Sequence, residues 1–189
     1  MIKLNIPLKE EEIRKLKIGD NVLLDGVIFT ARDMAHKFFV ENKDNEFKKL
    51  LDNGVIYHCG PIARKNNEWK IVAAGPTTSI REEPYMAEII KEYGIKAIIG
   101  KGGMAKKTSD ACKKYGCVYL AAIGGAAILL AKNIKRVVNV YHLEFGLPEA
   151  IWELEVEDFP AIVAMDANGN SLYDNVMEES RKMYMGLIK

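Results

Sequence analysis

The feature that most constrains this chain is an alternation of short apolar runs with helical stretches, which begins after Asn53-Gly54. Such alternation is typical of crossover units around a partly parallel sheet. We therefore expect an α/β fold. The strand-like runs lie at residues 55–58, 69–75, 96–100, 117–123 and 135–143, and the helical stretches lie at 84–93, 108–115 and 126–133.

The flanking regions predict further elements of the same domain. Residues 1–8 alternate as a half-buried strand does, and the charged residues 9–16 favour a short helix. Two turn dipeptides, Gly19-Asp20 and Asp25-Gly26, divide residues 18–30 into two expected short strands. A helix over 32–51, interrupted near 42–45, should follow. Asn168-Gly169 predicts a β-hairpin before an amphipathic helix over 174–188. Without repeats or linkers, residues 1–189 read as a single domain.

Composition excludes several classes of protein. The chain is 49% hydrophobic and 28% charged, which excludes disorder. Its 27 basic and 26 acidic side chains leave a net charge of +1, so no overall field attracts nucleic acid or an anionic membrane. The longest apolar run, residues 117–131, is shorter than the roughly 20 residues that a membrane span needs.

The N-terminus and the cysteines indicate a reducing compartment. Lys3 and the charged residues 9–12 precede any long apolar stretch, so we expect no secretory signal and a cytoplasmic protein. Cys59, Cys112 and Cys117 are too few and too scattered for a disulfide framework.

Three familiar ligand motifs are absent or incomplete. Gly102 stands where a phosphate loop needs Ser or Thr. Residues 100–105 fit a loose dinucleotide pattern, but the acidic residue expected about 20 positions later is missing. The three histidines lack the spacing of paired metal ligands, so we expect them to be packing or surface residues.

The segment that follows the strand over 69–75 gathers groups suited to an anion. It holds Thr77, Thr78 and Ser79, followed by Arg81. Hydroxyls, backbone N–H groups and a guanidinium bind carboxylate or phosphate well, and ligands bind at the carboxyl ends of strands in open α/β sheets. The alternative is helix capping, in which Ser79 and Glu82 form a capping box.

Two further strand ends repeat this theme. Lys101-Gly102-Gly103 places an ammonium beside an unobstructed backbone, and Gly124-Gly125 precedes an apolar helix. Each pair of glycines alone is explained by turn geometry. Because a parallel sheet would set the three strand ends side by side, together they predict an anion pocket.

Arg32 is a fourth candidate, at another transition from strand to helix. Arginine is scarce in this lysine-rich chain, so Arg32 and Arg81 at such transitions suggest bidentate binding of an anion. A surface ion pair between Arg32 and Asp33 or Glu41 is the alternative.

These segments together resemble the C-terminal part of the class I, iron–sulfur fumarate hydratases and the related tartrate dehydratases. The resemblance runs from about Leu16 to the C-terminus in matching order, and its specificity lies in the combination. The segments are TARDMAHK, IYHCGPI, GPTTSIRE, KGGM, IGGAAIL and YHLEFGLPEAIWELEVEDFPAIV.

The resemblance implies a swivelling β/β/α-type single domain, with a mixed sheet and flanking helices, that forms the β subunit of a hydro-lyase. The family reversibly hydrates a short dicarboxylate such as fumarate. By likeness, Thr77 handles the proton next to a carboxylate, with Thr78 as a rival. The groups implied to bind or enclose substrate are Arg32, Arg81, Lys101, Thr78, Gly102, Gly103, Gly124 and Gly125.

The resemblance also implies a [4Fe–4S] cluster, bound by a cluster-bearing α subunit rather than by this chain, in an α2β2 hetero-oligomer. No metal ligand is assigned here. Fumarate and L-tartrate remain alternative substrates. A rival from another class is a non-catalytic module that binds a carboxylate or a nucleotide.

Overall fold

The computed structural model describes residues 1–188, and a seven-stranded sheet in the order β1-β2-β3-β6-β7-β9-β8 forms its centre. The first five strands in this order, from β1 to β7, all run parallel to one another, as the alternation predicts. The strands are β1 (Ile2–Asn5), β2 (Asn21–Ala31), β3 (Val55–His58), β6 (Ala97–Gly100), β7 (Val118–Ala121), β8 (Ile134–Tyr141) and β9 (Ile151–Met165).

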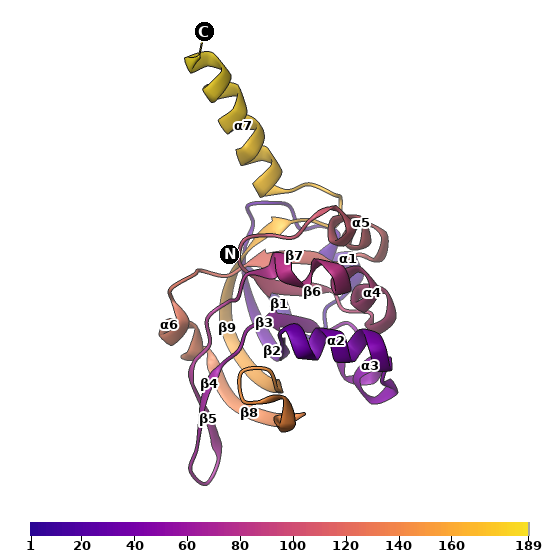
Figure 1. Cartoon of the computed structure of the whole chain (residues 1–189), viewed down its shortest axis with the longest axis vertical. Helices are drawn as coiled ribbons and strands as arrows, with labels where there is room; N and C mark the ends of the chain where they lie inside the picture. Colours follow the sequence, from indigo (N-terminus) through magenta and orange to yellow (C-terminus); the bar gives the residue numbers. More distant parts are fainter. Residues whose placement is uncertain (189) are drawn as a thin grey trace.

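The sheet closes on itself because β9 pairs with β2 as well as with β7 and β8. Strands β2, β3, β6, β7 and β9 thus form a ring, and the mixed sheet is partly a barrel. A separate antiparallel hairpin, β4 (Ile62–Lys65) and β5 (Trp69–Ala73), extends at the end opposite the C-terminal helix (Figure 1).

Helices cover the outside of the parallel strands, as Figure 1 shows for α2 to α5. Helices α4 and α5 are the crossovers from β3 to β6 and from β6 to β7. The α-helices are α1 (Glu10–Ile13), α2 (Asp33–Asn42), α3 (Asn45–Leu51), α4 (Glu83–Tyr93), α5 (Lys106–Tyr115), α6 (Ala127–Ala131) and α7 (Leu172–Leu187). Two 3₁₀ turns, η1 (Ser79–Glu82) and η2 (Leu143–Phe145), complete the elements.

Successive side chains of the parallel strands enter two different cores. In β6, Ala97 and Ile99 point into the barrel, whereas Ile98 packs under the helices. This alternation follows from the two-residue period of a strand. A strand buried on both faces is largely apolar, which is why residues 55–57 and 97–100 are continuous apolar runs.

Two turns behave differently from the sequence prediction. Residues 21–31 form one strand, not two, because Gly26 accommodates the irregularity as a bulge with φ of +118°. A Cβ at Gly26 would lie 2.8 Å from the carbonyl oxygen of Ile6. Asn168-Gly169 forms the predicted turn and closes a single antiparallel bridge between Met165 and Ser171. The hairpin goes no further, because the Ser171 hydroxyl accepts a hydrogen bond from the Asp174 N–H and caps α7.

The other elements mostly follow the predictions. The interruption near residue 43 separates α2 from α3, and α7 matches the expected C-terminal helix. Strand β4 and the first half of β9 were not predicted. No helix within residues 1–188 combines the length and the apolar character that crossing a membrane requires.

The barrel core generates a test of stability. Ile28 in β2 is fully buried inside the barrel, whereas Ile62 in β4 is 62% exposed. Ile28→Ala should lower the free energy of unfolding by about 2–5 kcal/mol because it leaves a cavity. Ile62→Ala is the matched control and should change it by about 0.5 kcal/mol or less. Urea unfolding measures both, and equal losses would contradict this assignment of the core.

Candidate functional site

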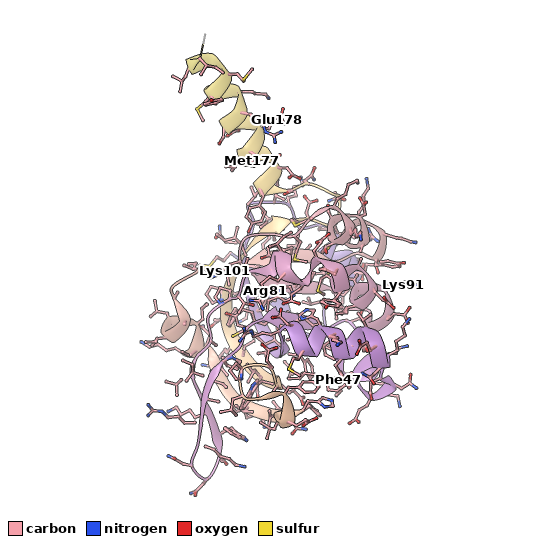
Figure 2. The ribbon with its side chains drawn as sticks, in the orientation of Figure 1. Phe47, Arg81, Lys91, Lys101, Met177 and Glu178 are labelled. Atoms are coloured by element: carbon pink, nitrogen blue, oxygen red, sulfur yellow. The ribbon has the colours of Figure 1, made fainter. Side chains whose placement is uncertain are left out.

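Three backbone hydrogen bonds bring the predicted anion-binding segments together. We call these bonds, which connect residues 77–79 to His58 and Lys101, the join. The Thr77 N–H donates to the carbonyl oxygen of His58 at the end of β3, over 2.7 Å. The Lys101 N–H, just after β6, donates to the Thr77 carbonyl over 3.2 Å, and the Ser79 N–H donates to the Lys101 carbonyl over 2.9 Å. Figure 2 labels Arg81 and Lys101 at this end of the sheet.

This join replaces the arrangement that the sequence predicted. We expected the strand over 69–75 to lie beside β6 and β7, but β5 belongs to the separate hairpin. The segment after it, residues 76–79, reaches the parallel strands, where Pro76 pairs with Cys59 after β3 and Thr78 pairs with Lys101 after β6. Ladder hydrogen bonds therefore set the positions of Thr77 and Thr78.

The predicted glycines occupy different places around this join. A Cβ on Gly102 would lie 3.8 Å from the Thr78 methyl group, and one on Gly124 would lie 3.8 Å from the Lys101 side chain. Gly125 faces open space. Gly103 is buried, and a Cβ there would lie 2.7 Å from the ring of Tyr173. Gly102 and Gly124 thus border the exposed threonine and lysine, whereas Gly103 packs against the base of α7.

Both predicted arginines are paired with carboxylates. Arg32 lies 3.3 Å from Glu149, and Arg81 pairs with Asp33. The alternative partners proposed for Arg32 were Asp33 and Glu41, and the structure gives it neither. A Cβ on Gly60 would lie 2.6 Å from the Arg32 side chain, so this glycine leaves room for the arginine. The pair between Arg81 and Asp33 joins the η1 turn to the start of α2.

A buried hydrogen-bond network lies under the join. The Tyr119 hydroxyl accepts from the Gly103 N–H over 3.3 Å and donates to the Ser79 hydroxyl over 2.9 Å. The Ser79 hydroxyl lies 2.9 Å from Nδ1 of His58. Because Ser79 binds these two side chains and makes no cap hydrogen bond, the capping-box alternative is wrong.

Gly100 lies directly beside this network. A Cβ at this position would lie 1.9 Å from the Ser79 hydroxyl and 3.0 Å from the Tyr119 hydroxyl. Gly100 is the last residue of β6, immediately before Lys101. The network therefore requires glycine here because of space, not because of backbone conformation.

Two histidines and a glutamate form a second buried group next to the first. The rings of His36 and His58 are 4.9 Å apart, and Nδ1 of His36 lies 3.4 Å from a Glu82 carboxylate oxygen. The same Nδ1 is 2.8 Å from the carbonyl oxygen of Arg32, so it carries the hydrogen. All three side chains are at most 1% exposed. We predicted packing or surface roles for the histidines, and spacing along the chain gave no sign that two of them meet here.

Burial shifts the protonation of this group. It raises the pKa of Glu82 to about 8, with a further contribution from the neighbouring Asp33 carboxylate. It lowers the pKa of His36 to about 4 and lowers the pKa of His58 as well. Glu82 is therefore largely protonated at neutral pH and donates to Asp33. Burial opposes ionisation of Asp33, but the hydrogen bonds from Glu82 and Arg81 lower its pKa.

The three thiols do not form a metal site. Cys112 and Cys117 lie next to each other under the helices, whereas Cys59 belongs to the barrel core. Burial raises the pKa of Cys59 to about 12 and raises that of Cys117 as well, which disfavours the thiolate form that metals bind. Among residues 1–188, no three histidine, cysteine or acidic side chains come together in a way that could hold a metal ion.

A groove lies elsewhere on the molecule. It has a volume of about 1180 Å³ and runs between the β4–β5 hairpin, α6 and β8, with Trp69, Ile128 and Val137 in its walls. None of the predicted site residues lines it. Arg81 and Lys101 instead lie on an open surface at the ends of the parallel strands.

Comparison with known proteins places the chain in a family. Residues 1–176 match the family model described as the fumarase C-terminus. The chain belongs to this family. The resemblance found in the sequence is thereby confirmed at the level of the family.

Three relatives show how the chain relates to whole proteins. It is 50% identical to a Geobacillus stearothermophilus protein provisionally named fumarate hydratase class I, over 95% of this chain but only 35% of that protein. It is 51% identical to a Methanocaldococcus jannaschii protein provisionally named L(+)-tartrate dehydratase subunit beta, over 94% of this chain and 92% of that one. It is 36% identical to the Escherichia coli L(+)-tartrate dehydratase subunit beta, over 96% and 89%.

The space at Gly100 generates the next prediction. Gly100→Ala should lower the free energy of unfolding by about 1–3 kcal/mol because its Cβ overlaps the Ser79 hydroxyl. The same substitution in a Ser79→Ala background should cost about 1 kcal/mol less, since the closest contact is gone. Gly124→Ala is the control and should have little effect. Additive losses at positions 79 and 100 would contradict the contact.

The raised pKa of Glu82 predicts a pH dependence. An unfolded glutamate loses its proton near pH 4.5, but folded Glu82 keeps it until about pH 8, so its contribution makes stability fall as pH rises between these values. Glu82→Gln should make the curve of stability against pH less steep between pH 6.5 and 8, by up to about 1.4 kcal/mol per pH unit.

Urea unfolding at several pH values measures this slope. The range starts at pH 6.5 because below it the unfolded state gains a proton at His36 that the folded state lacks. The exposed Glu11→Gln is the control and should leave the slope unchanged. A slope identical in Glu82→Gln and the parent would disprove the shift.

Proposed function

We propose that this chain is the β subunit of an iron–sulfur-dependent hydro-lyase that reversibly hydrates a short dicarboxylate, most simply fumarate to L-malate. The observation that carries the proposal is the join of Thr77–Ser79 to His58 and Lys101, which gathers hydroxyls and cations at one end of the sheet. The proposal also draws on family membership and on the relatives named as beta subunits.

L-tartrate is the second candidate substrate. The relatives named for fumarate and for tartrate are 50% and 51% identical to this chain, so similarity favours neither. The two substrates differ in their hydroxyl groups, whereas the groups described here suit the carboxylates that both possess.

In the proposed reaction, Arg32, Arg81 and Lys101 bind the substrate carboxylates. Removal of a proton next to a carboxylate builds negative charge on that carboxylate, and fixed cations stabilise it. The substrate would compete with Asp33 for Arg81, which is half-exposed and accessible. Lys101 is exposed beside Gly124, where a ligand can approach it closely.

Thr77 is proposed to move the proton. Its backbone is held at both its N–H and its carbonyl, which fixes the side chain at the join. A threonine hydroxyl is a weak base at neutral pH unless cations or a partner group lower its pKa. The cations of Arg81 and Lys101 supply that electrostatic help in this proposal, and Thr78 is the rival for the role.

The [4Fe–4S] cluster is assigned to a partner α subunit, in an α2β2 assembly in the cytoplasm. The three thiols of this chain are buried, and Cys59 lies in a different core from Cys112 and Cys117, so they do not fit a cluster. One relative is nearly three times as long as the part of it that matches this chain, and two others are named as beta subunits. Both observations support a partner segment that completes the protein.

Reconstitution tests the function directly. The chain is combined anaerobically with its cluster-bearing partner, and hydration of fumarate and dehydration of L-tartrate are followed separately. Turnover of either substrate supports the hydro-lyase, and the faster reaction identifies the substrate. No turnover of either, together with tight nucleotide binding by the chain alone, would support the rival binding module.

The cations generate a prediction in the reconstituted enzyme. Arg81→Lys and Lys101→Ala should each lower kcat/KM by about tenfold or more, which corresponds to roughly 1.4 kcal/mol of transition-state stabilisation. Arg81→Lys keeps the charge but loses the bidentate fork. Lys107→Ala, on the exposed face of α5, is the control and should turn over normally. Normal kcat/KM in both test variants would remove these residues from the site.

The two threonines are distinguished by a second pair of variants. Thr77→Ala should lower kcat by about a hundredfold or more if its hydroxyl transfers the proton, because general acid–base groups contribute on that scale. Thr78→Ala should have a much smaller effect on kcat. The assay is initial-rate kinetics on the reconstituted enzyme, with cluster absorbance as a check on assembly. Equal, mild losses would assign both residues to a structural role.

A further inference from the structure

Glu82 is a buried acid that the proposed reaction does not use. It is 1% exposed and directly follows Arg81, one of the proposed substrate-binding cations, which Figure 2 labels. Its Oε2 atom has no hydrogen-bond partner, although Nδ1 of His36 lies 3.4 Å away. The carboxyl group makes a hydrogen bond with the side chain of Asp33. Through this bond, the buried acid is connected to the surface.

Asp33 lies between Glu82 and the candidate site. It is the first residue of α2, its side chain is half-exposed, and it accepts a hydrogen bond from the Arg81 guanidinium. Two carboxyl groups form a hydrogen bond only when one of them carries a proton, because an ionised carboxylate can only accept. The more deeply buried Glu82 keeps that proton and donates it to the bond. Asp33 therefore accepts from both Glu82 and Arg81.

The groups around Glu82 determine what a charge on it would do. The two histidines nearby are neutral at pH 7 and above, because burial lowers the pKa of each ring. Glu149 adds negative charge to this region but is already paired with Arg32. A charge on Glu82 would therefore act chiefly on Asp33 and Arg81. The charged and titratable groups that face this region are Arg32, Asp33 and His36 at the start of α2, His58 of β3, Arg81 of η1, Tyr85 of α4 and Glu149 before β9.

We propose that Glu82 is a positioning residue for Arg81: by donating a hydrogen bond to Asp33, it weakens the hold of Asp33 on the guanidinium and leaves Arg81 able to bind a substrate carboxylate. The inference rests on the proposed function, which assigns a substrate to Arg81. When Glu82 loses its proton, Asp33 loses a donor and a second negative charge lies beside the guanidinium. Arg81 is then held more tightly inside the protein, and an incoming dicarboxylate is repelled.

The expected effect is a rise of KM with pH that Glu82→Gln abolishes. Glutamine keeps a donor for Asp33 but cannot ionise. Burial raises the pKa of Glu82 to about 8, so its charge appears between pH 7 and 9. Over this range, KM of the reconstituted parent should rise about threefold or more relative to KM of Glu82→Gln. The ratio of their kcat values should stay constant, because a competing internal partner weakens substrate binding as a whole.

A second variant tests whether Glu82 acts through Asp33. The hydrogen bond and the charge of Asp33 both favour the proton on Glu82. Asp33→Asn should therefore move the midpoint of the KM rise to lower pH. Glu41→Gln removes an exposed carboxylate from the other end of α2 and is the matched control. Its KM should follow pH as the parent's does, and a merely structural role of Glu82 would change KM equally at every pH.

The isolated chain provides a readout that needs neither turnover nor a partner subunit. The nuclear magnetic resonance signal of the Arg81 Nε–H group is identified by its loss in Arg81→Lys, which is practicable because the chain has only six arginines. In the parent, this signal should shift with pH with a midpoint at about 8, the pKa of Glu82. The step should be absent in Glu82→Gln and present in Glu41→Gln. Circular dichroism at each pH checks that the variants are folded.

Three results would overturn the inference. These are the same pH dependence of KM in the parent and in Glu82→Gln, a midpoint that Asp33→Asn does not move, or an Arg81 signal that does not follow the ionisation of Glu82. If the reconstituted enzyme turns over neither fumarate nor L-tartrate, the proposed function fails instead. The Arg81 signal of the isolated chain then decides alone whether Glu82 controls this arginine.

Discussion

The candidate site depends on the three hydrogen bonds that hold residues 77–79 against the ends of β3 and β6. Without them, the threonines and Arg81 would sit on a connection between a peripheral hairpin and α4. With them, the connection becomes an extension of the central sheet, and its side chains take up positions relative to Lys101 that the ladder determines. Backbone hydrogen bonds of this kind fix a site more firmly than surface ion pairs can.

Beneath this join, the protein buries several polar side chains. Ser79, Tyr119 and His58 satisfy one another, but His36, His58 and Glu82 each retain a buried polar atom without a protein partner. Buried polar groups without partners cost free energy. The raised pKa of Glu82 and the lowered pKa of His36 reduce that cost, because both side chains are then neutral. The cations of Arg81 and Lys101 therefore lie above a layer of buried polar side chains that carries little charge of its own.

Most of the parallel part of the fold could be predicted from the sequence, because a strand buried on both faces is an apolar run of characteristic length. The bulge at Gly26 and the long strand β9 could not, since both depend on pairing between distant segments. At the site, the residue types were visible at strand ends, but their neighbours were not. Glu149 reaches Arg32 from 117 positions away, and Ser79, expected to cap a helix, binds Tyr119 instead. Such long-range contacts leave no trace in local spacing.

The alternation of side chains between two cores has a consequence for how this chain can change in length. One residue inserted into or deleted from β6 would exchange Ile98 with its neighbours, turning the barrel core outward and the helix-facing surface inward. It would also put a side chain where Gly100 leaves space for Ser79. Natural insertions and deletions should therefore avoid β3, β6 and β7. They should collect at the exposed tip of the β4–β5 hairpin, residues 66–68, where the chain can lengthen without changing any register of the central sheet.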